Sequence, residues 1–402
     1  MNLSRQFKSA GLISAVLAIP ASMAYLAIHA SHTLASSPAI IQTPAAQILN
    51  TREEQLKIQL AILLDTSSSM DGLIDQTRQQ IWQVVNEFSS ATQGGRKPVL
   101  EVAVFEYGNN ALASANGYIR QVSALTTELD AVSEALFSLK TNGGEEYCGQ
   151  VIDHAVKQLA WSQSNNDIKA IFIAGNEAFS QGPVPFREAI QAAKTRGIIV
   201  NTIHAGDYDE GARSGWKDGA VLAGGNFMSI DHNHQVAHID APQDDRIAEL
   251  NTQLNQTYIP YGSEGKRKHA RQMEQDANSS RVSSGLLAKR AKSKSSSYYE
   301  NSSWDLVDAH KNGSVDLENL EEESLPDTMR DMSTAQRKQY IKKAETERSR
   351  LQAEIVRLSQ ARDAYVTEQR RKQSQQVVST VEDALITAIR KQAEDKHYEF
   401  KN

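Results

Sequence analysis

The chain has 402 residues, of which 40% are hydrophobic and 23% are charged, and its formal net charge at pH 7 is -6. This length supports one or two domains with substantial cores, and the negative charge argues against a protein that binds nucleic acid through its whole surface. The only cysteine is Cys148. An internal disulfide is therefore excluded, unlike in small disulfide-stabilised secreted modules.

The N-terminus has the pattern of an export signal. Arg5 and Lys8 precede an apolar stretch, Gly11–Ile28, and small residues follow it as far as Ala35. This order of basic, apolar and small residues is that of a secretory signal peptide. The stretch also approaches the length that spans a bilayer, so an uncleaved anchor is the alternative. We predict a signal peptide or N-terminal anchor over residues 1–35, and an exported protein of the periplasm or cell envelope, either free or held at the inner membrane.

Strand and helix patterns alternate after a linker, rich in Ala, Pro, Ser and Thr, at residues 36–53. Strands are predicted at Lys57–Leu64, Val99–Tyr107, Tyr118–Ser123, Ile168–Ala174, Ile198–His204 and Asn226–Ile230. Helices are predicted at Leu73–Phe88, Thr127–Leu139, Gly149–Trp161, Val184–Arg196, Gly215–Ala223 and Asp244–Asn255. Such alternation is typical of a sheet covered by helices on both faces. The predicted fold class is therefore α/β, with a mostly parallel, doubly wound, Rossmann-type sheet over residues 54–262.

The most informative motif follows the first predicted strand. The apolar residues 60–64 end at Asp65, and hydroxyl side chains follow at Ser67 and Ser69. Open α/β sheets hold their sites at the carboxyl ends of the strands, and hard oxygen donors select magnesium, manganese or calcium over zinc. The structural alternative is a helix cap, in which the same side chains accept from the first free amides of the next helix.

This Asp-x-Ser-x-Ser spacing, after a strand and before an amphipathic helix, resembles the first motif of the von Willebrand factor A domain, and the element order over residues 54–262 is similar to that family. The resemblance implies a metal-ion-dependent adhesion site. In such a site Ser67 and Ser69 bind the cation through their hydroxyls, and Asp65 approaches it directly or through water. The chain would then be a non-enzymatic protein-binding or adhesion module of the cell envelope. Its cation would be Mg²⁺, with Mn²⁺ or Ca²⁺ as alternatives, and its protein partner would contribute an acidic residue.

The other two ligand loops depart from the family pattern. In the second loop, Thr141 precedes the glycines instead of following them, so the ligand position aligns with Glu145. The third loop has Asn176 and Glu177 where the family has Thr-Asp-Gly. A carboxylate that binds the cation directly would hold it more tightly but would attract a partner's carboxylate less. The candidate metal ligands are Asp65, Ser67, Ser69, Glu145, Thr141, Asn176 and Glu177. Metal occupancy of this variant site is left open.

Enzyme signatures are absent from the sequence. It has no phosphate-binding glycine loop with a lysine, no nucleophile elbow and no His-Glu-x-x-His motif. Cys148 follows two glutamates whose charges oppose thiolate formation, so we interpret it as structural. His232, His234 and His238 have a spacing that zinc or copper can use, but a polar surface loop is the simpler interpretation. We predict no catalytic residues and no nucleic-acid partner.

The C-terminal part of the chain is predicted to be helical. Lys and Arg outnumber Asp and Glu between residues 263 and 300, and we interpret residues 263–332 as a basic linker or extension that is solvated or contacts an acidic membrane surface. Over residues 333–397, apolar residues at alternating spacings of three and four predict amphipathic helices, with Arg348 and Arg362 interrupting the apolar stripe. A helical hairpin within the chain is the first interpretation, and a coiled coil between copies is the second.

A second function is compatible with the same features. The chain would be an envelope scaffold protein with a vestigial metal site, acting through its basic segment and its C-terminal helices. Membrane association would come from the N-terminal segment, and self-association from the helices. The two functions differ in one expectation, because Asp65→Ala would abolish partner capture in the first and be silent in the second.

Overall fold

The structure is a computed structural model that describes residues 55–71, 74, 84, 87, 88, 91–230, 239–373 and 381–400. The predicted export segment and linker, most of the predicted helix Leu73–Phe88 and the three histidines of residues 231–238 lie outside the described residues. Among the helices that the structure describes, none is long and apolar enough to cross a membrane.

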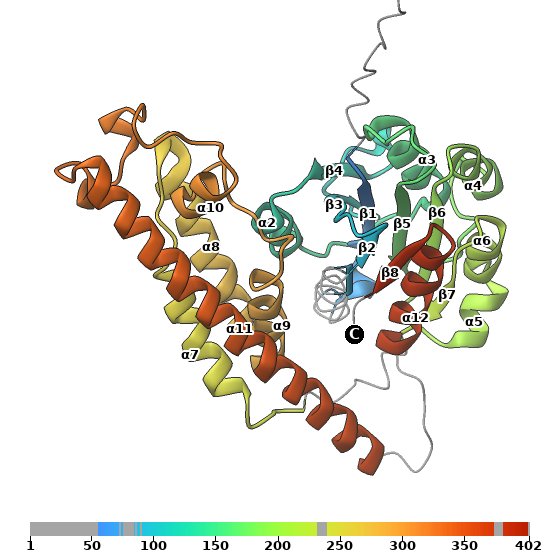
Figure 1. The fold of residues 1–402 in the computed structure, drawn as a ribbon. Coiled ribbons are helices and arrows are strands. Elements are labelled where there is room, and N and C mark those ends of the chain that lie inside the picture. Colours follow the sequence, from blue (N-terminus) through green and yellow to red (C-terminus); the bar gives the residue numbers. More distant parts are fainter. Residues whose placement is uncertain are drawn as a thin grey trace, which may run out of the picture. The chain divides into compact units, whose positions relative to one another are not determined.

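A six-stranded sheet with the strand order β4-β3-β1-β5-β6-β7 forms the centre of residues 55–230 (Figure 1). Its strands are β1 (Lys57–Asp65), β3 (Val99–Tyr107), β4 (Ile119–Thr126), β5 (Ile168–Gly175), β6 (Ile199–His204) and β7 (Phe227–Ser229). All neighbouring strands are parallel except β4, which pairs antiparallel with β3. β1 and β5 are buried along almost their whole length because both faces of the sheet are covered. The predicted α/β fold with a mostly parallel sheet is confirmed.

Helices cover the two faces of this sheet and create two cores. They are α2 (Leu129–Ser138), α3 (Cys148–Gln158), α4 (Phe186–Thr195), α5 (Tyr208–Arg213) and α6 (Trp216–Leu222). Successive residues of β1 point to opposite faces, so Leu60 belongs to one core and Ala61 to the other. The predicted elements agree with these bounds to within a few residues, except that α5 was missed. This short helix begins after Asp207, whose carboxylate accepts from the backbone N–H of Glu210.

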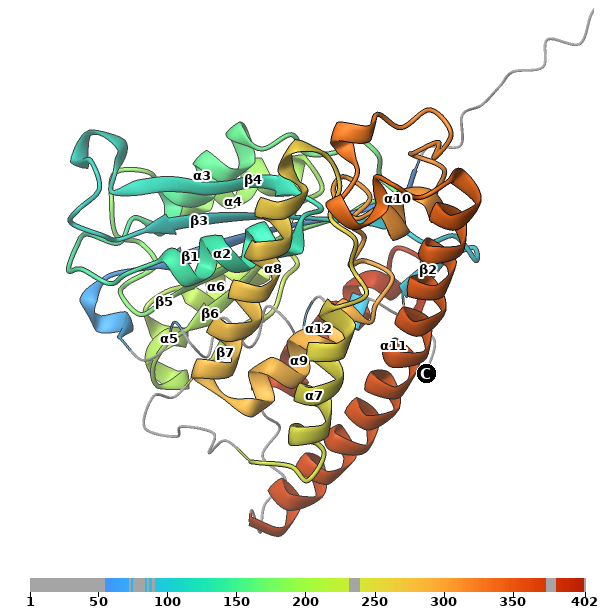
Figure 2. The same ribbon diagram turned by 90° about the vertical axis from the view of Figure 1, so that its left-hand side faces the viewer.

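A helical region follows the sheet in the sequence. Its helices are α7 (Asp244–Asn255), α8 (Gly262–Val282), α9 (Ser284–Lys294), α10 (Leu306–Lys311) and α11 (Thr334–Gln373). The long helix α11 packs along α7 and α9 (Figures 1 and 2). Trp304, between α9 and α10, is buried and stacks on Tyr258.

The predicted hairpin over residues 333–397 is wrong, because α11 makes its main contacts with α7 and α9, whereas the next helix packs against β7 and β8. The arginines that interrupt the apolar stripe explain the difference. Arg348 forms ion pairs with Asp305 and Asp308, and Arg362 pairs with Asp244 of α7. Both arginines are buried, so this face of α11 packs against an acidic surface of the same chain. Self-association through a coiled coil between copies remains a prediction.

Residues 263–300, interpreted as a solvated basic helix or flexible linker, are helical in α8 and α9, but the expectation that they are solvated is wrong because these helices contain buried charges. Arg290 and Lys294 are both fully buried and both pair with Asp276 of α8. Arg290 forms a second ion pair, at 2.7 Å, with Asp130 of α2. A run of Lys and Arg in the sequence does not reveal that acids of other helices neutralise some of its members.

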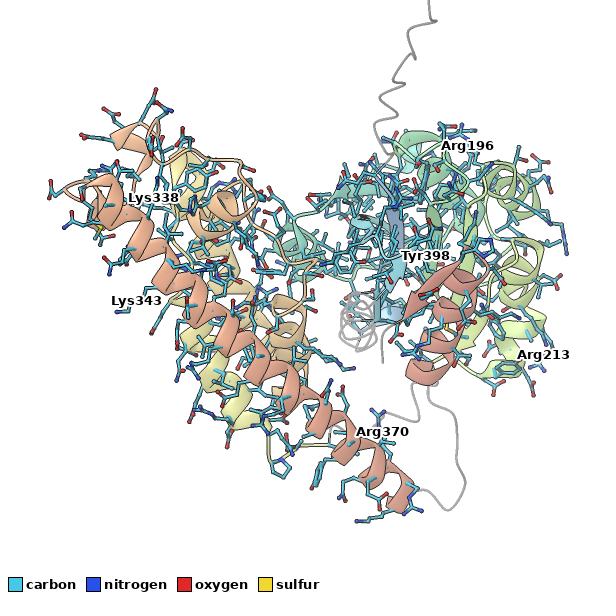
Figure 3. The ribbon with its side chains drawn as sticks, viewed as in Figure 1. Arg196, Arg213, Lys338, Lys343, Arg370 and Tyr398 are labelled. Atoms are coloured by element: carbon cyan, nitrogen blue, oxygen red, sulfur yellow. The ribbon has the colours of Figure 1, made fainter. Side chains whose placement is uncertain are left out.

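The C-terminal segment returns to the sheet. The helix α12 (Val381–Glu394) precedes a short strand, β8 (Tyr398–Phe400), which pairs antiparallel with β2 (Ala91–Gln93). Tyr398 is buried on β8 (Figure 3) and shares a core with residues of β1 and β3. The sheet domain is therefore discontinuous in sequence, and residues 239–373 are inserted before its last helix.

Candidate functional site

Three loops meet at the carboxyl end of the sheet. Backbone hydrogen bonds join the loop after β1 to the end of β3 and to the loop before α3. Thr66 donates to Tyr107 O, and Asn142 donates to Thr66 O, each at 2.9 Å. Gly108 lies so close to β1 that an added Cβ atom would be 2.6 Å from Asp65 Oδ1. Gly108 also has a positive φ of 76°, so glycine is required there for both reasons. These contacts bring residues of separate loops into one cluster.

Asp65 lies at the floor of this cluster and is completely buried. Its Oδ1 accepts from the backbone N–H of Ser67 at 2.7 Å, whereas its Oδ2 is buried without a hydrogen-bond partner among the described residues. Burial raises the pKa of Asp65 to about 7, hydrogen bonds from the backbone N–H and the side chain of Ser67 oppose this rise, and the charge of Glu146 adds to it. A buried carboxylate oxygen without a donor is costly unless a cation or a donor reaches it.

The predicted hydroxyl ligands form a row beside Asp65. Ser67 Oγ and Ser69 Oγ are 2.8 Å apart, and Ser69 Oγ donates to Asn176 Oδ1 at 3.1 Å. The structure thus brings together the candidate donors of the first loop and Asn176 of the third. The alternative interpretation as a helix cap finds no support in the turn Ser68–Met70, where the side chain of Ser67 accepts from no backbone amide.

The second loop contributes Glu146, not the Glu145 that the alignment selected. Glu145 is exposed, whereas Glu146 is buried, and its Cγ lies beside Gly108 in the same way as Asp65 Oδ1. Burial, together with the charge of Glu177, raises the pKa of Glu146 to about 7, and a hydrogen bond with the Ser67 side chain opposes this rise. Consecutive residues of an extended loop point in opposite directions, so a register error of one residue exchanges the buried side chain for the exposed one.

The remaining two candidates lie at the edge of the cluster. Thr141 donates its hydroxyl to the carboxylate of Asp71 in the first loop. Glu177 is exposed, and its charge raises the pKa of both Asp65 and Glu146. Its backbone carbonyl accepts from Trp216 Nε1 at 2.7 Å, which fixes the third loop against α6.

The donor set fits a hard divalent cation. No three His, Cys, Asp or Glu side chains of the described residues are grouped so that they hold a metal by themselves, so a site here depends on the serine hydroxyls. Asp65 Oδ2 and the Glu146 carboxylate are both buried, and the charge of Glu146 adds to the rise that burial causes in the pKa of Asp65. A cation between them would remove that repulsion and give the orphaned oxygen a partner.

Cys148 is the first residue of α3 and is fully buried beside the cluster, with its Sγ 3.6 Å from Tyr107 Oη. Burial raises the pKa of this thiol, and the Tyr107 hydroxyl opposes the rise. We therefore expect the native chain to resist a thiol reagent at pH 8 and the chain unfolded in urea to react with it, as followed by absorbance. Rapid labelling of the native chain would contradict the interpretation of Cys148 as structural.

Comparison with known proteins identifies the family of the sheet domain. The family model for the von Willebrand factor type A domain matches residues 59–214. No curated protein matches the chain.

Several solved structures are similar to part of the chain. The conserved hypothetical protein BatB from Bacteroides thetaiotaomicron is 15% identical, with a TM-score of 0.33, over 43% of this chain and 90% of that one. The SpRpn10 VWA domain is 16% identical, with a TM-score of 0.33, over 45% and 91%. Proximal thread matrix protein 1 from the mussel byssus, with a zinc-occupied MIDAS motif, is 11% identical, with a TM-score of 0.32, over 45% and 43%.

The structural similarities are too low in identity and TM-score to support an argument about function. The family match stands independently of them, and it covers the loops that carry Asp65, Glu146 and Glu177. It does not extend to α7–α11. Residues 59–214 of the chain are therefore a von Willebrand factor type A domain.

Proposed function

We propose that the chain is a non-enzymatic protein-binding module whose loop cluster binds a divalent cation and a protein partner. The observation that carries the proposal is the buried Asp65 Oδ2, which has no hydrogen-bond partner among the described residues, beside the buried carboxylate of Glu146. Asp65, Ser67, Ser69 and Glu146 would hold the cation, and Asn176 is within reach of Ser69. Their hard oxygens favour Mg²⁺, with Mn²⁺ or Ca²⁺ as alternatives. When bound, the cation supplies a coordination position for an oxygen atom of the partner.

The absence of enzymatic activity belongs to the same proposal. Cys148 is buried and its thiol pKa is raised, so it does not supply a nucleophile. The described loops of the cluster present carboxylates, hydroxyls and amides, which suit cation binding.

Export to the periplasm or cell envelope is supported by the order of basic, apolar and small residues over residues 1–35. The alternative envelope scaffold loses part of its basis, because the basic segment already pairs within the chain. Lys268 contacts Glu128, and Arg271 contacts Glu134. Fewer of its charges are therefore available for a membrane surface.

Cation binding is tested by isothermal titration of the full chain with Mg²⁺, Mn²⁺ and Ca²⁺. We expect saturable binding that weakens at least about tenfold in Asp65→Asn, because one carboxylate of the site is lost. Without a cation, the free energy of unfolding of the same variant, measured in urea, should be about 1 kcal/mol higher, since the repulsion with Glu146 is removed. Both effects should be missing in Asp331→Asn, which changes an exposed aspartate of the helical region.

Two outcomes would contradict the cation site. No heat with any of the three cations, from a chain that is folded by circular dichroism, would identify the site as vestigial. Equal cation affinity in Asp65→Asn and in the unchanged chain would place the bound ion elsewhere.

A further inference from the structure

The loops at the carboxyl end of the sheet are strongly acidic. The described segments at this end are residues 66–71, 108–118, 139–147, 176–185 and 205–210, the last of which includes the first turn of α5. They contain the acids Asp71, Glu145, Glu146, Glu177, Asp207, Asp209 and Glu210 and one base, the exposed Lys140. Arg213, the last residue of α5, lies beyond them (Figure 3). We call these loops the acidic face.

Ion pairs with neighbouring elements satisfy some acids elsewhere on the described surface. Glu128, Glu134 and Glu354 each form an ion pair with an arginine or lysine of another element. Among the described residues, no Lys, Arg or His forms an ion pair with Glu145, Asp209 or Glu210. These three charges are therefore without an ion pair among the described residues, and a cationic ligand would neutralise them.

A second observation points to a ligand with a positive charge. Asp65 is buried at the floor of the acidic face, and its Oδ2 has no partner among the described residues. This oxygen needs a cation or a donor. The buried Asp65 carboxylate and the exposed acids of the acidic face thus both attract a positively charged ligand.

The charge of a cation-loaded site would be unlike that of the family pattern that the first loop resembles. Neutral hydroxyls alone would leave a bound divalent cation electrophilic toward a carboxylate. Here Asp65 and Glu146 would balance its two charges, and the exposed acids of the rim would still surround it. An approaching carboxylate would meet like charge, whereas an ammonium or guanidinium group would be attracted and steered.

We propose that the acidic face binds a segment rich in Lys and Arg on the protein partner, instead of the acidic residue expected from the resemblance. The inference rests on the proposed function in that it uses the same face of the domain. It adds the chemical class of the partner, which is a cationic polypeptide.

The test measures binding of fluorescent decalysine and decaglutamate peptides to the full chain by anisotropy, at about 50 mM salt, where screening is weak. The site variant combines Glu145→Gln, Asp209→Asn and Glu210→Gln, which are exposed and are not proposed cation ligands. The matched control combines Glu321→Gln, Glu322→Gln and Glu323→Gln, and removes the same charge from an exposed part of the helical region.

We expect decalysine to bind and decaglutamate not to bind, with and without Mg²⁺. The site variant should weaken decalysine binding about tenfold, because each exposed pair contributes a few tenths of a kcal/mol to about 1 kcal/mol. The control should weaken it less than about twofold. Tighter binding of decaglutamate than of decalysine would overturn the inference. Equal weakening by the two triple variants would also overturn it, since it would show attraction by net charge alone.

Failure of the inference is distinguishable from failure of the proposed function. If titration detects cation binding but the site variant binds decalysine like the control, the inference fails and the cation site stands. If no cation binds but decalysine binding still depends on Glu145, Asp209 and Glu210, the cation site fails and the inference stands.

Discussion

Removal of residues 381–402 is expected to unfold the von Willebrand factor A domain at 25 °C or to leave it close to its unfolding midpoint. Ile389, Ala393 and Tyr398 are almost completely buried in the core beneath the sheet. Exposing two large side chains costs about 5 kcal/mol, which is comparable with the whole stability of a typical domain. Gln392 and Asn201 also exchange two buried amide hydrogen bonds, at 2.7 and 3.3 Å, that the truncation would break.

Urea unfolding followed by circular dichroism measures this effect. Ile389→Ala gives a milder version of the same change and should cost about 2–5 kcal/mol. The matched control, Lys391→Ala, changes an exposed residue of the same helix and should cost less than about 0.5 kcal/mol. An unchanged midpoint in the truncated chain would show that the sheet is stable without α12 and β8.

The second large effect is expected at Arg290, whose replacement by methionine should destabilise the chain by about 3–5 kcal/mol. Its guanidinium is fully buried between Asp130 of α2 and Asp276 of α8, at 2.7 and 2.6 Å. Removing this guanidinium leaves both carboxylates buried, and each has lost one positively charged partner. Arg267→Met is the matched control, because its pair with Glu264 is exposed and its loss should change stability far less than the loss of Arg290.

The pH dependence of stability provides a further signature of this cluster. Burial alone would raise the pKa of Asp276, but the charges of Lys294 and Arg290 outweigh it and hold the pKa below its usual range. A depressed carboxyl pKa contributes stability above the unfolded pKa of about 3.9 and loses it as the pH falls toward the folded value. In Arg290→Met the folded pKa should rise, so the destabilisation should be largest near neutral pH and smaller in acid. A constant difference between pH 3 and pH 7 would contradict the role of Asp276.

Predictions made from local sequence were the most successful. The central strands are continuous apolar runs, and Asp65, Ser67 and Ser69 follow the first of them directly, so their position at the end of the sheet was predictable. Glu146 was not, because two adjacent glutamates are equivalent until the path of the loop decides which one is buried. The identity of a residue is local information, whereas the direction of its side chain in an irregular loop is not.

Predictions that depended on distant partners failed. Arg348 and Arg362 were interpreted as interruptions of an apolar stripe, since the acids that pair with them lie far away in the sequence. β2 and β8 were missed for the same reason. Each has only three residues, and each forms a strand by pairing with the other.

The return of the C-terminus to the sheet has a consequence for biosynthesis. Gln93 Nε2 donates to the carbonyl of Lys396 across 303 residues of sequence, and the β2–β8 pair closes over a similar separation. A nascent chain on the ribosome therefore cannot complete this domain until residues 381–400 have been synthesised. Until then the apolar residues that pack against Ile389 and Tyr398 lack that cover, and the inserted helices α7–α11 are synthesised before the domain that contains them is finished.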